Sequence, residues 1–134
     1  MAITVCWLDE TQTVVFYSFA GKWDWNELVG AMGQANALMG TVPHPVDVIA
    51  DLSGSLHLPV NLLEMGRNAA KVHRPANMGM VVVVQGGAFL EPAVNVMRRI
   101  YRELDYAMRY VNSLDEARAA IVQVRAARTT SSDG

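Results

Sequence analysis

The sequence predicts an α/β domain in which an N-terminal β-hairpin continues into alternating strands and helices. Segments rich in β-branched and aromatic residues alternate with segments whose apolar residues recur every three or four positions, which is typical of strand and helix units. One run, at 78–84, is continuously apolar, as expected for a strand that is covered on both faces. We therefore expect the order β-β-α-β-α-β-α-β-α, with βαβαβα crossovers, and a mixed, largely parallel five-stranded sheet covered by four helices.

Length and composition restrict the class of protein. The 134 residues suffice for one domain, which we place at 1–126, followed by a polar tail at 127–134 that is expected to be disordered. The 11 Lys and Arg against 13 Asp and Glu give a net charge of −2, which does not attract nucleic acid. The apolar runs are shorter than the ~20 residues of a membrane span, and no secretory signal begins the chain. These features predict a cytoplasmic protein without nucleic-acid binding or membrane insertion.

The first two strands are expected at 3–8 and 13–19, joined by a short polar connection. We expect each strand to have one strongly covered face, because successive side chains point to opposite sides. The alternating sets are Ile3, Val5 and Trp7 against Thr4 and Cys6, and Val15, Tyr17 and Phe19 against Val14, Phe16 and Ser18. Cys6 lies inside the first of these strands, where a small buried thiol is the expected role for a single cysteine.

A first helix is expected from Trp25 to Met39. Asp24 and Glu27 have the spacing of a capping box, and apolar residues then recur at helical intervals up to the following glycine. Trp23 and Trp25 flank the cap. Their expected role is to pack against the start of the helix, and the alternative is that the two rings form a platform for a ligand.

The third strand, at 46–52, leads into a candidate binding loop at 52–60. Asp51 near the end of this strand has two possible roles. It could accept backbone N–H groups and fix the following turn, which is the role we favour, or it could be a functional acid. Because α/β folds place their sites beyond the carboxyl ends of strands, binding residues are expected here. The polar residues that follow Asp51 in this loop are Ser53, Ser55 and His57.

The remaining elements continue the same alternation. They are a helix at 60–73, a strand at 78–84, a helix at 88–104, a strand at 108–111, and a helix after the capping box formed by Ser113 and Glu116.

Catalytic and metal-binding motifs do not stand out. The three histidines are far apart in the sequence and match no metal-ligand spacing. Ser53 or Ser55 could combine with His57 and Asp51 as nucleophile, base and orienting acid, but neighbouring loop residues rarely have that geometry. We expect no metal, no cofactor and no enzymatic activity.

The order of a hairpin, a capped helix and a strand that ends in Asp51-Leu52-Ser53-Gly54 resembles the STAS domain of anti-sigma-factor antagonists. The resemblance covers residues 3–126 and is to the SpoIIAA-like branch, some of whose members lack the phosphorylation motif. It implies a cytoplasmic interaction module that is often switched by phosphorylation of a serine at the start of the next helix. The corresponding stretch is Pro59-Val60-Asn61-Leu62, which has no hydroxyl, so a kinase would have to use Ser53 or Ser55.

Two functions are therefore expected, in this order. The first is a non-catalytic regulatory module that binds a protein partner through the 52–60 loop, in a bacterial signalling pathway of the anti-sigma antagonist type. The second is a carrier or sensor that binds a small apolar ligand near the 52–60 loop, indicated by eight methionines, the two neighbouring tryptophans and the apolar loop residues Leu56, Leu58 and Val60. With 51% apolar residues, a homodimer is also plausible. The candidate binding residues are Trp23, Trp25, Asp51, Ser53, Ser55, His57 and Asn61.

Overall fold

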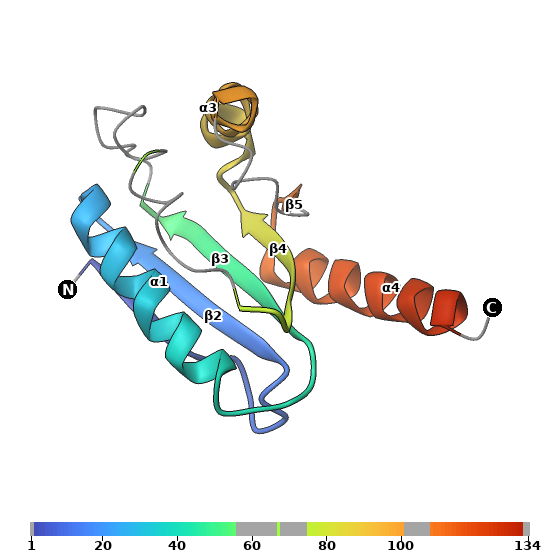
Figure 1. The fold of residues 1–134 in the computed structure, drawn as a ribbon. Coiled ribbons are helices and arrows are strands. Elements are labelled where there is room, and N and C mark those ends of the chain that lie inside the picture. The colour runs from blue at the N-terminus through green and yellow to red at the C-terminus, as the bar shows by residue number, and fades with distance from the viewer. Residues whose placement is uncertain (1, 56–66, 68–74, 101–107, 133–134) are drawn as a thin grey trace.

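The computed structural model describes residues 2–55, 67, 75–100 and 108–132 (Figure 1). Five strands form one sheet in the order β1-β2-β3-β4-β5. The strands are β1 (Ile3–Trp7), β2 (Val14–Ala20), β3 (Val46–Gly54), β4 (Met78–Val84) and β5 (Met108–Val111). The helices are α1 (Trp25–Met39), α3 (Gly87–Ile100) and α4 (Leu114–Ser132).

The sheet is mixed and largely parallel, which confirms the predicted α/β class. β1 runs antiparallel to β2, with Ile3 opposite Phe19 and Trp7 opposite Val15. The other three neighbouring pairs are parallel. The described residues contain three helices rather than the four expected, because the helix expected at 60–73 lies outside the described residues apart from position 67.

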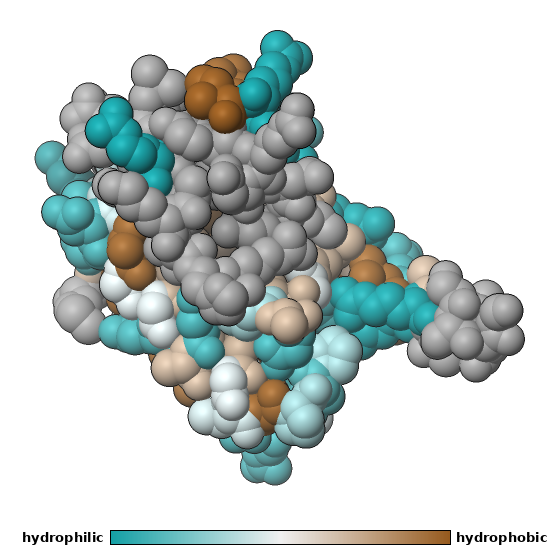
Figure 2. All heavy atoms as spheres, viewed as in Figure 1, coloured by the Kyte–Doolittle hydropathy of each residue, from teal (hydrophilic) through white to brown (hydrophobic). Residues whose placement is uncertain are grey.

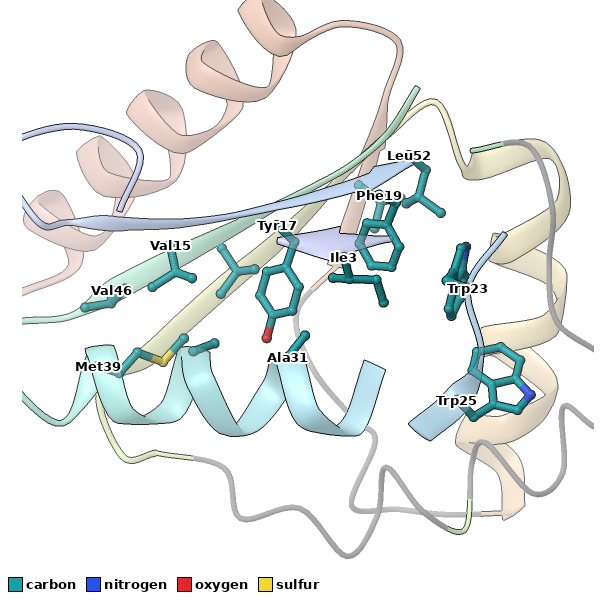
Figure 3. Packing of buried hydrophobic residues seen from close by; sticks show 13 residues of the cluster. Ile3, Val15, Tyr17, Phe19, Trp23, Trp25, Ala31, Met39, Val46 and Leu52 are labelled. Atoms are coloured by element: carbon teal, nitrogen blue, oxygen red, sulfur yellow. The ribbon is translucent and has the colours of Figure 1, made fainter. Parts of the chain in front are cut away.

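Each face of the sheet has its own hydrophobic core, because successive strand residues point to opposite sides. On one face, the side chains of Val15, Tyr17 and Phe19 pack against α1 (Figure 3). On the other face, α4 covers the neighbouring set of strand residues. The buried members of that second cluster are Val14, Ile49, Val82, Val84, Ala117, Ala120 and Ile121.

The predicted first helix has the predicted boundaries. The Asp24 carboxylate accepts a hydrogen bond from the backbone N–H of Glu27 at 2.8 Å, as a helix N-cap does. The helix ends at Gly40, whose own N–H bonds back to the carbonyl of Asn36 at 3.0 Å.

The expectation of a buried Cys6 is wrong, because this residue is exposed. Cys6 lies on the face of the sheet opposite α1. On that opposite face, α4 mainly contacts β3, β4 and β5. In the described part of the chain, no helix therefore covers the outer face of β1.

The chain near its C-terminal end also differs from the prediction. A disordered tail was expected to begin at 127, but α4 continues through Ser132. The physical reason is visible at Arg128, whose guanidinium pairs with the buried carboxylate of Asp47 at 2.6 Å. An ordered ion pair of this kind holds the last turns of the helix against the sheet.

Within the described ranges, no helix is both long and apolar enough to cross a membrane. Figure 2 shows apolar surface over α3, where Val96 and Ile100 are 53% and 54% exposed.

Candidate functional site

The candidate site begins with Asp51, near the carboxyl end of β3. Its Oδ1 accepts a hydrogen bond from the backbone N–H of Ser53 at 2.9 Å. The predicted bond to the backbone two residues ahead is therefore present, because short acidic side chains readily make it, but it lies inside β3, which continues to Gly54 instead of ending at 52 as expected.

Gly54, the last residue of β3, lies directly against β2. The carbonyl of Gly54 accepts from the N–H of Gly21 at 2.9 Å, and a Cβ on Gly54 would lie 2.7 Å from the carbonyl oxygen of Phe19. Any larger residue would force these two backbones apart. The close approach of β2 therefore explains why position 54 is a glycine.

Ser55 provides a third attachment. Its hydroxyl donates to the carbonyl oxygen of Gly21 at 2.5 Å, and its backbone N–H donates to the carbonyl of Leu52 at 3.0 Å. The residue is only 2% exposed. The proton that a nucleophilic serine would lose is thus engaged by a backbone carbonyl, and the hydroxyl is hidden from a kinase.

The result is a short, anchored segment from which Ser53 projects. Ser53 is exposed, whereas Ser55 is buried. Of the two residues expected as phosphoacceptors, Ser53 is the one that a second protein can reach in this structure.

Trp23 and Trp25 are buried side chains of the α1 core. Each is 7% exposed, and their rings meet edge to face with centroids 5.0 Å apart. Trp23 makes a similar contact with Phe19, beside which Leu52 of β3 lies (Figure 3). The packing role is therefore the one observed. Among the described residues, Nε1 of Trp23 is a buried N–H donor without a hydrogen-bond acceptor.

The other two predicted binding residues, His57 and Asn61, lie outside the described residues. The structure therefore brings together Trp23, Asp51, Ser53 and Ser55 near one end of the sheet through Gly21 and the Phe19–Leu52 contact. The arrangement of Ser53 or Ser55 with His57 stays a prediction.

Sequence reasoning missed a charged cluster around Asp47, near the amino end of β3. Asp47 is completely buried, and its two oxygens accept from Arg125 Nε at 3.0 Å and Arg128 Nη2 at 2.6 Å. The backbone N–H of Met80 in β4 donates a further bond of 2.8 Å. Arg125 also donates to the carbonyl of Thr13 at 2.8 Å. The Asp47 cluster thus joins α4, β3, β4 and the residue before β2.

The electrostatics of this cluster keep Asp47 ionised. Burial alone would raise the pKa of Asp47, but the hydrogen bonds from Arg128 and Met80, together with the nearby positive charge, outweigh burial and hold the pKa below its ordinary value. A carboxylate that is ionised at neutral pH and held by several hydrogen bonds is suited to structural clamping rather than to proton transfer.

A weak signal for the cluster was present in the sequence. Asp47 interrupts an apolar strand, and a buried acid in such a position requires a partner. Arg125 and Arg128 are three positions apart, so they lie on one side of a helix. The sequence spacing of the two arginines, however, does not indicate that α4 packs against Asp47 of β3.

The described residues include no group of His, Cys, Asp and Glu side chains arranged to hold a metal ion. Comparison with known proteins finds no match, since no protein-family model, curated protein or solved structure is significantly similar to the chain. The resemblance to STAS domains stays a prediction from the sequence.

Proposed function

We propose that this chain is a non-catalytic regulatory module that binds a protein partner at the carboxyl end of β3. The observation that carries the proposal is the presentation of Ser53, which is exposed while Asp51, Gly54 and Ser55 fix the backbone around it. A segment that is already ordered loses little conformational entropy on binding.

A second feature of the same end of the sheet supports this proposal. Helix α3 starts three residues after β4 ends, so it lies beyond the carboxyl end of that strand (Figure 1). Its side chains of Val96 and Ile100 are exposed and one helical turn apart. Protein interfaces combine exposed polar residues with exposed apolar side chains, and both kinds occur at this end of the sheet.

The resemblance of the sequence to STAS domains suggests a more specific role. In that role the module belongs to a bacterial signalling pathway of the anti-sigma antagonist type, in the cytoplasm, with Ser53 as the phosphoacceptor. Phosphorylation would add about two negative charges to an exposed loop that already carries Asp51, which would change the partner that the loop can accept.

The test is affinity capture of the tagged full-length chain from the cells that produce it, with quantitative mass spectrometry of the bound proteins. We compare the wild type with Ser53→Arg and Val96→Glu, both at exposed positions. The matched control is Gln34→Arg, at an exposed position of α1. We expect one protein that is retained by the wild type and by Gln34→Arg and is lost with Ser53→Arg.

Equal recovery of that protein by all four chains would reject this binding surface. The same preparations also test the switch. Peptide mapping that finds phosphate on Ser53 supports the signalling role, and phosphate found only elsewhere on the chain contradicts it.

A second candidate function is a carrier for a small ligand, and the observation that favours it is the N–H of Trp23, which has no acceptor among the described residues. A buried donor without an acceptor is costly, so a ligand that offers an acceptor beside Phe19 and Trp25 would be stabilised there. The test is native mass spectrometry of the gently purified protein, followed by tryptophan fluorescence with the ligand that is found. We expect Trp23→Phe to weaken that binding, and purified chains without any bound small molecule would reject the carrier function.

A further inference from the structure

Among the described residues, β1 is an edge strand of the sheet. Leu8 donates its N–H to the carbonyl of Val14, and Ala20 donates to the carbonyl of Ala2. In an antiparallel pair, alternate residues direct their peptide groups to opposite sides of the strand. The residues of β1 whose N–H and C=O point away from β2 are therefore Ile3, Val5 and Trp7.

No second strand pairs with this edge in the part of the chain that the structure describes. The strand is Ile-Thr-Val-Cys-Trp, which contains neither a charged residue nor a proline. Proteins usually protect an exposed edge with such residues, because open edges pair with other chains. Val5 and Trp7 are also only partly buried, so apolar side chains accompany the open edge.

We infer that β1 pairs with β1 of a second copy of this chain, antiparallel and centred on Val5, so that two five-stranded sheets join into one. This surface is independent of the Ser53 loop and goes beyond the function proposed above.

Hydrogen bonding favours this register. With Val5 opposite Val5 of the copy, Ile3 lies opposite Trp7 of the copy, and every outward N–H meets an outward carbonyl. If the pairing is centred on Thr4 or Cys6 instead, either Trp7 or Ile3 no longer faces a residue of the partner strand β1. The pairing centred on Val5 is therefore the one that uses the whole edge.

The side chains favour a copy of the same chain over an unrelated strand. On the α1 face, Ile3, Val5 and Trp7 meet the same three apolar residues of the copy, and cross-strand pairs of this type are stabilising. On the other face, Thr4 lies opposite Cys6 of the copy, and both are small and uncharged. The strand is thus complementary to itself under a twofold axis, which is the usual symmetry of dimers.

The test uses cysteine cross-linking of the full-length protein under mild oxidation. Position 4 and Cys6 of the copy form a non-hydrogen-bonded pair with Cα atoms about 4.5 Å apart, which is within the range of a disulfide. The two native Cys6 residues would be diagonal neighbours at roughly 7–8 Å, beyond that range. We therefore expect Thr4→Cys to give a covalent dimer, whereas the wild type with its single cysteine does not.

The matched control is Gln34→Cys, whose new thiol is exposed on α1. Pairing of the edges raises the effective concentration of the two thiols, so Thr4→Cys should cross-link about tenfold faster than the control or more. Cross-linking of Thr4→Cys at the rate of the control would overturn the inference. Wild-type protein that cross-links as rapidly as Thr4→Cys would overturn the register centred on Val5.

Sedimentation provides a second measurement that needs no oxidation. Val5→Pro removes an N–H that points away from β2, so the bond pattern within the hairpin is retained while the outer edge is blocked. We expect a wild-type dimer and a folded Val5→Pro monomer, with folding checked by circular dichroism. A wild-type protein that stays monomeric at millimolar concentration would overturn the inference.

Discussion

Asp47 shows how this domain tolerates a buried charge. An ionised carboxylate is expensive to remove from water unless hydrogen bonds and opposite charges replace its hydration. Here the replacements are two guanidiniums and one backbone N–H, at distances from 2.6 to 3.0 Å. Both arginine side chains remain 37% exposed, so the positive charges keep part of their own hydration.

The first prediction concerns the charge of Asp47. Asp47→Asn keeps the size of the side chain and removes its negative charge, so we expect the free energy of unfolding to fall by roughly 2 kcal/mol. The loss is smaller than for a fully buried pair because the freed arginines can be solvated. Urea denaturation followed by tryptophan fluorescence measures this loss of stability.

Asp115→Asn, at an exposed position, is the control and should change stability by only a few tenths of a kcal/mol. Equal effects of the two substitutions would contradict the clamp.

The second prediction concerns pH. The pKa of Asp47 is lower in the folded protein than its ordinary value of 3.8, so its contribution to stability is complete above that value and is lost as the pH falls through the folded pKa. We expect the stability difference between wild type and Asp47→Asn to be constant near neutral pH and to shrink in acid below 3.8. Unfolding curves measured across this pH range test the prediction. A stability difference that grows in acid would contradict it.

At the scale of elements, Gly79 in β4 makes room for the Asp47 cluster. A Cβ at this position would overlap Oδ1 of Asp47 and would lie 2.8 Å from Nη2 of Arg128. The contact of β4 with β3 and α4 therefore depends on the absence of a side chain here.

The third prediction follows from that contact. Gly79→Ala should lower the free energy of unfolding by roughly 2 kcal/mol, and by much less in an Asp47→Ala background, because the obstructing carboxylate is then gone. Gly33→Ala is the control. Nothing lies within 4 Å of a Cβ there, and the position is exposed on α1, so alanine should stabilise the helix by about 1 kcal/mol. Additive effects of Gly79→Ala and Asp47→Ala would contradict the steric argument.

The elements that could be predicted are those specified by local signals. The limits of α1 follow from the cap at Asp24 and the glycine at 40, both adjacent to the helix that they define. The bond near the end of β3 follows from Asp51 and a backbone N–H two residues away. The exposure of Cys6 could not be predicted in this way, because it depends on which strands α4 covers.

At the scale of the whole molecule, the sequence predicts those features of the candidate site that depend on neighbouring residues, and not those that depend on distant ones. The exposed member of the site, Ser53, lies at the end of β3, where the backbone bond from Asp51 is a local feature that the sequence predicts. The burial of Ser55 depends instead on Gly21, which is 34 positions away, and the role of Asp47 depends on arginines 78 and 81 positions away. A periodic pattern indicates which face of an element is apolar, but it does not state which other element covers that face.

The fourth prediction concerns the end of α4. A chain that stops after residue 127 loses the pairing of Arg128 with Asp47, whereas a chain that stops after 128 retains the residue. We expect the shorter chain to be less stable by about 1.5 kcal/mol, the typical contribution of a hydrogen bond to a charged group. Thermal or urea unfolding of the two truncated chains and the full chain measures the difference. Equal stability of the two truncated chains would contradict a role for Arg128.

The Asp47 clamp has a further consequence, which concerns time rather than equilibrium. Asp47 and Arg125 are 78 residues apart, so a long loop must close before they can meet, and we expect this contact to form after the folding barrier has been crossed. Asp47→Asn should then leave the refolding rate nearly unchanged and accelerate unfolding by roughly thirtyfold for a loss of 2 kcal/mol. Stopped-flow kinetics in urea would show this in the unfolding limb alone, and a slower refolding limb would contradict it. The last helix would thus determine how long each folded molecule persists, while the rest of the domain determines how quickly it forms.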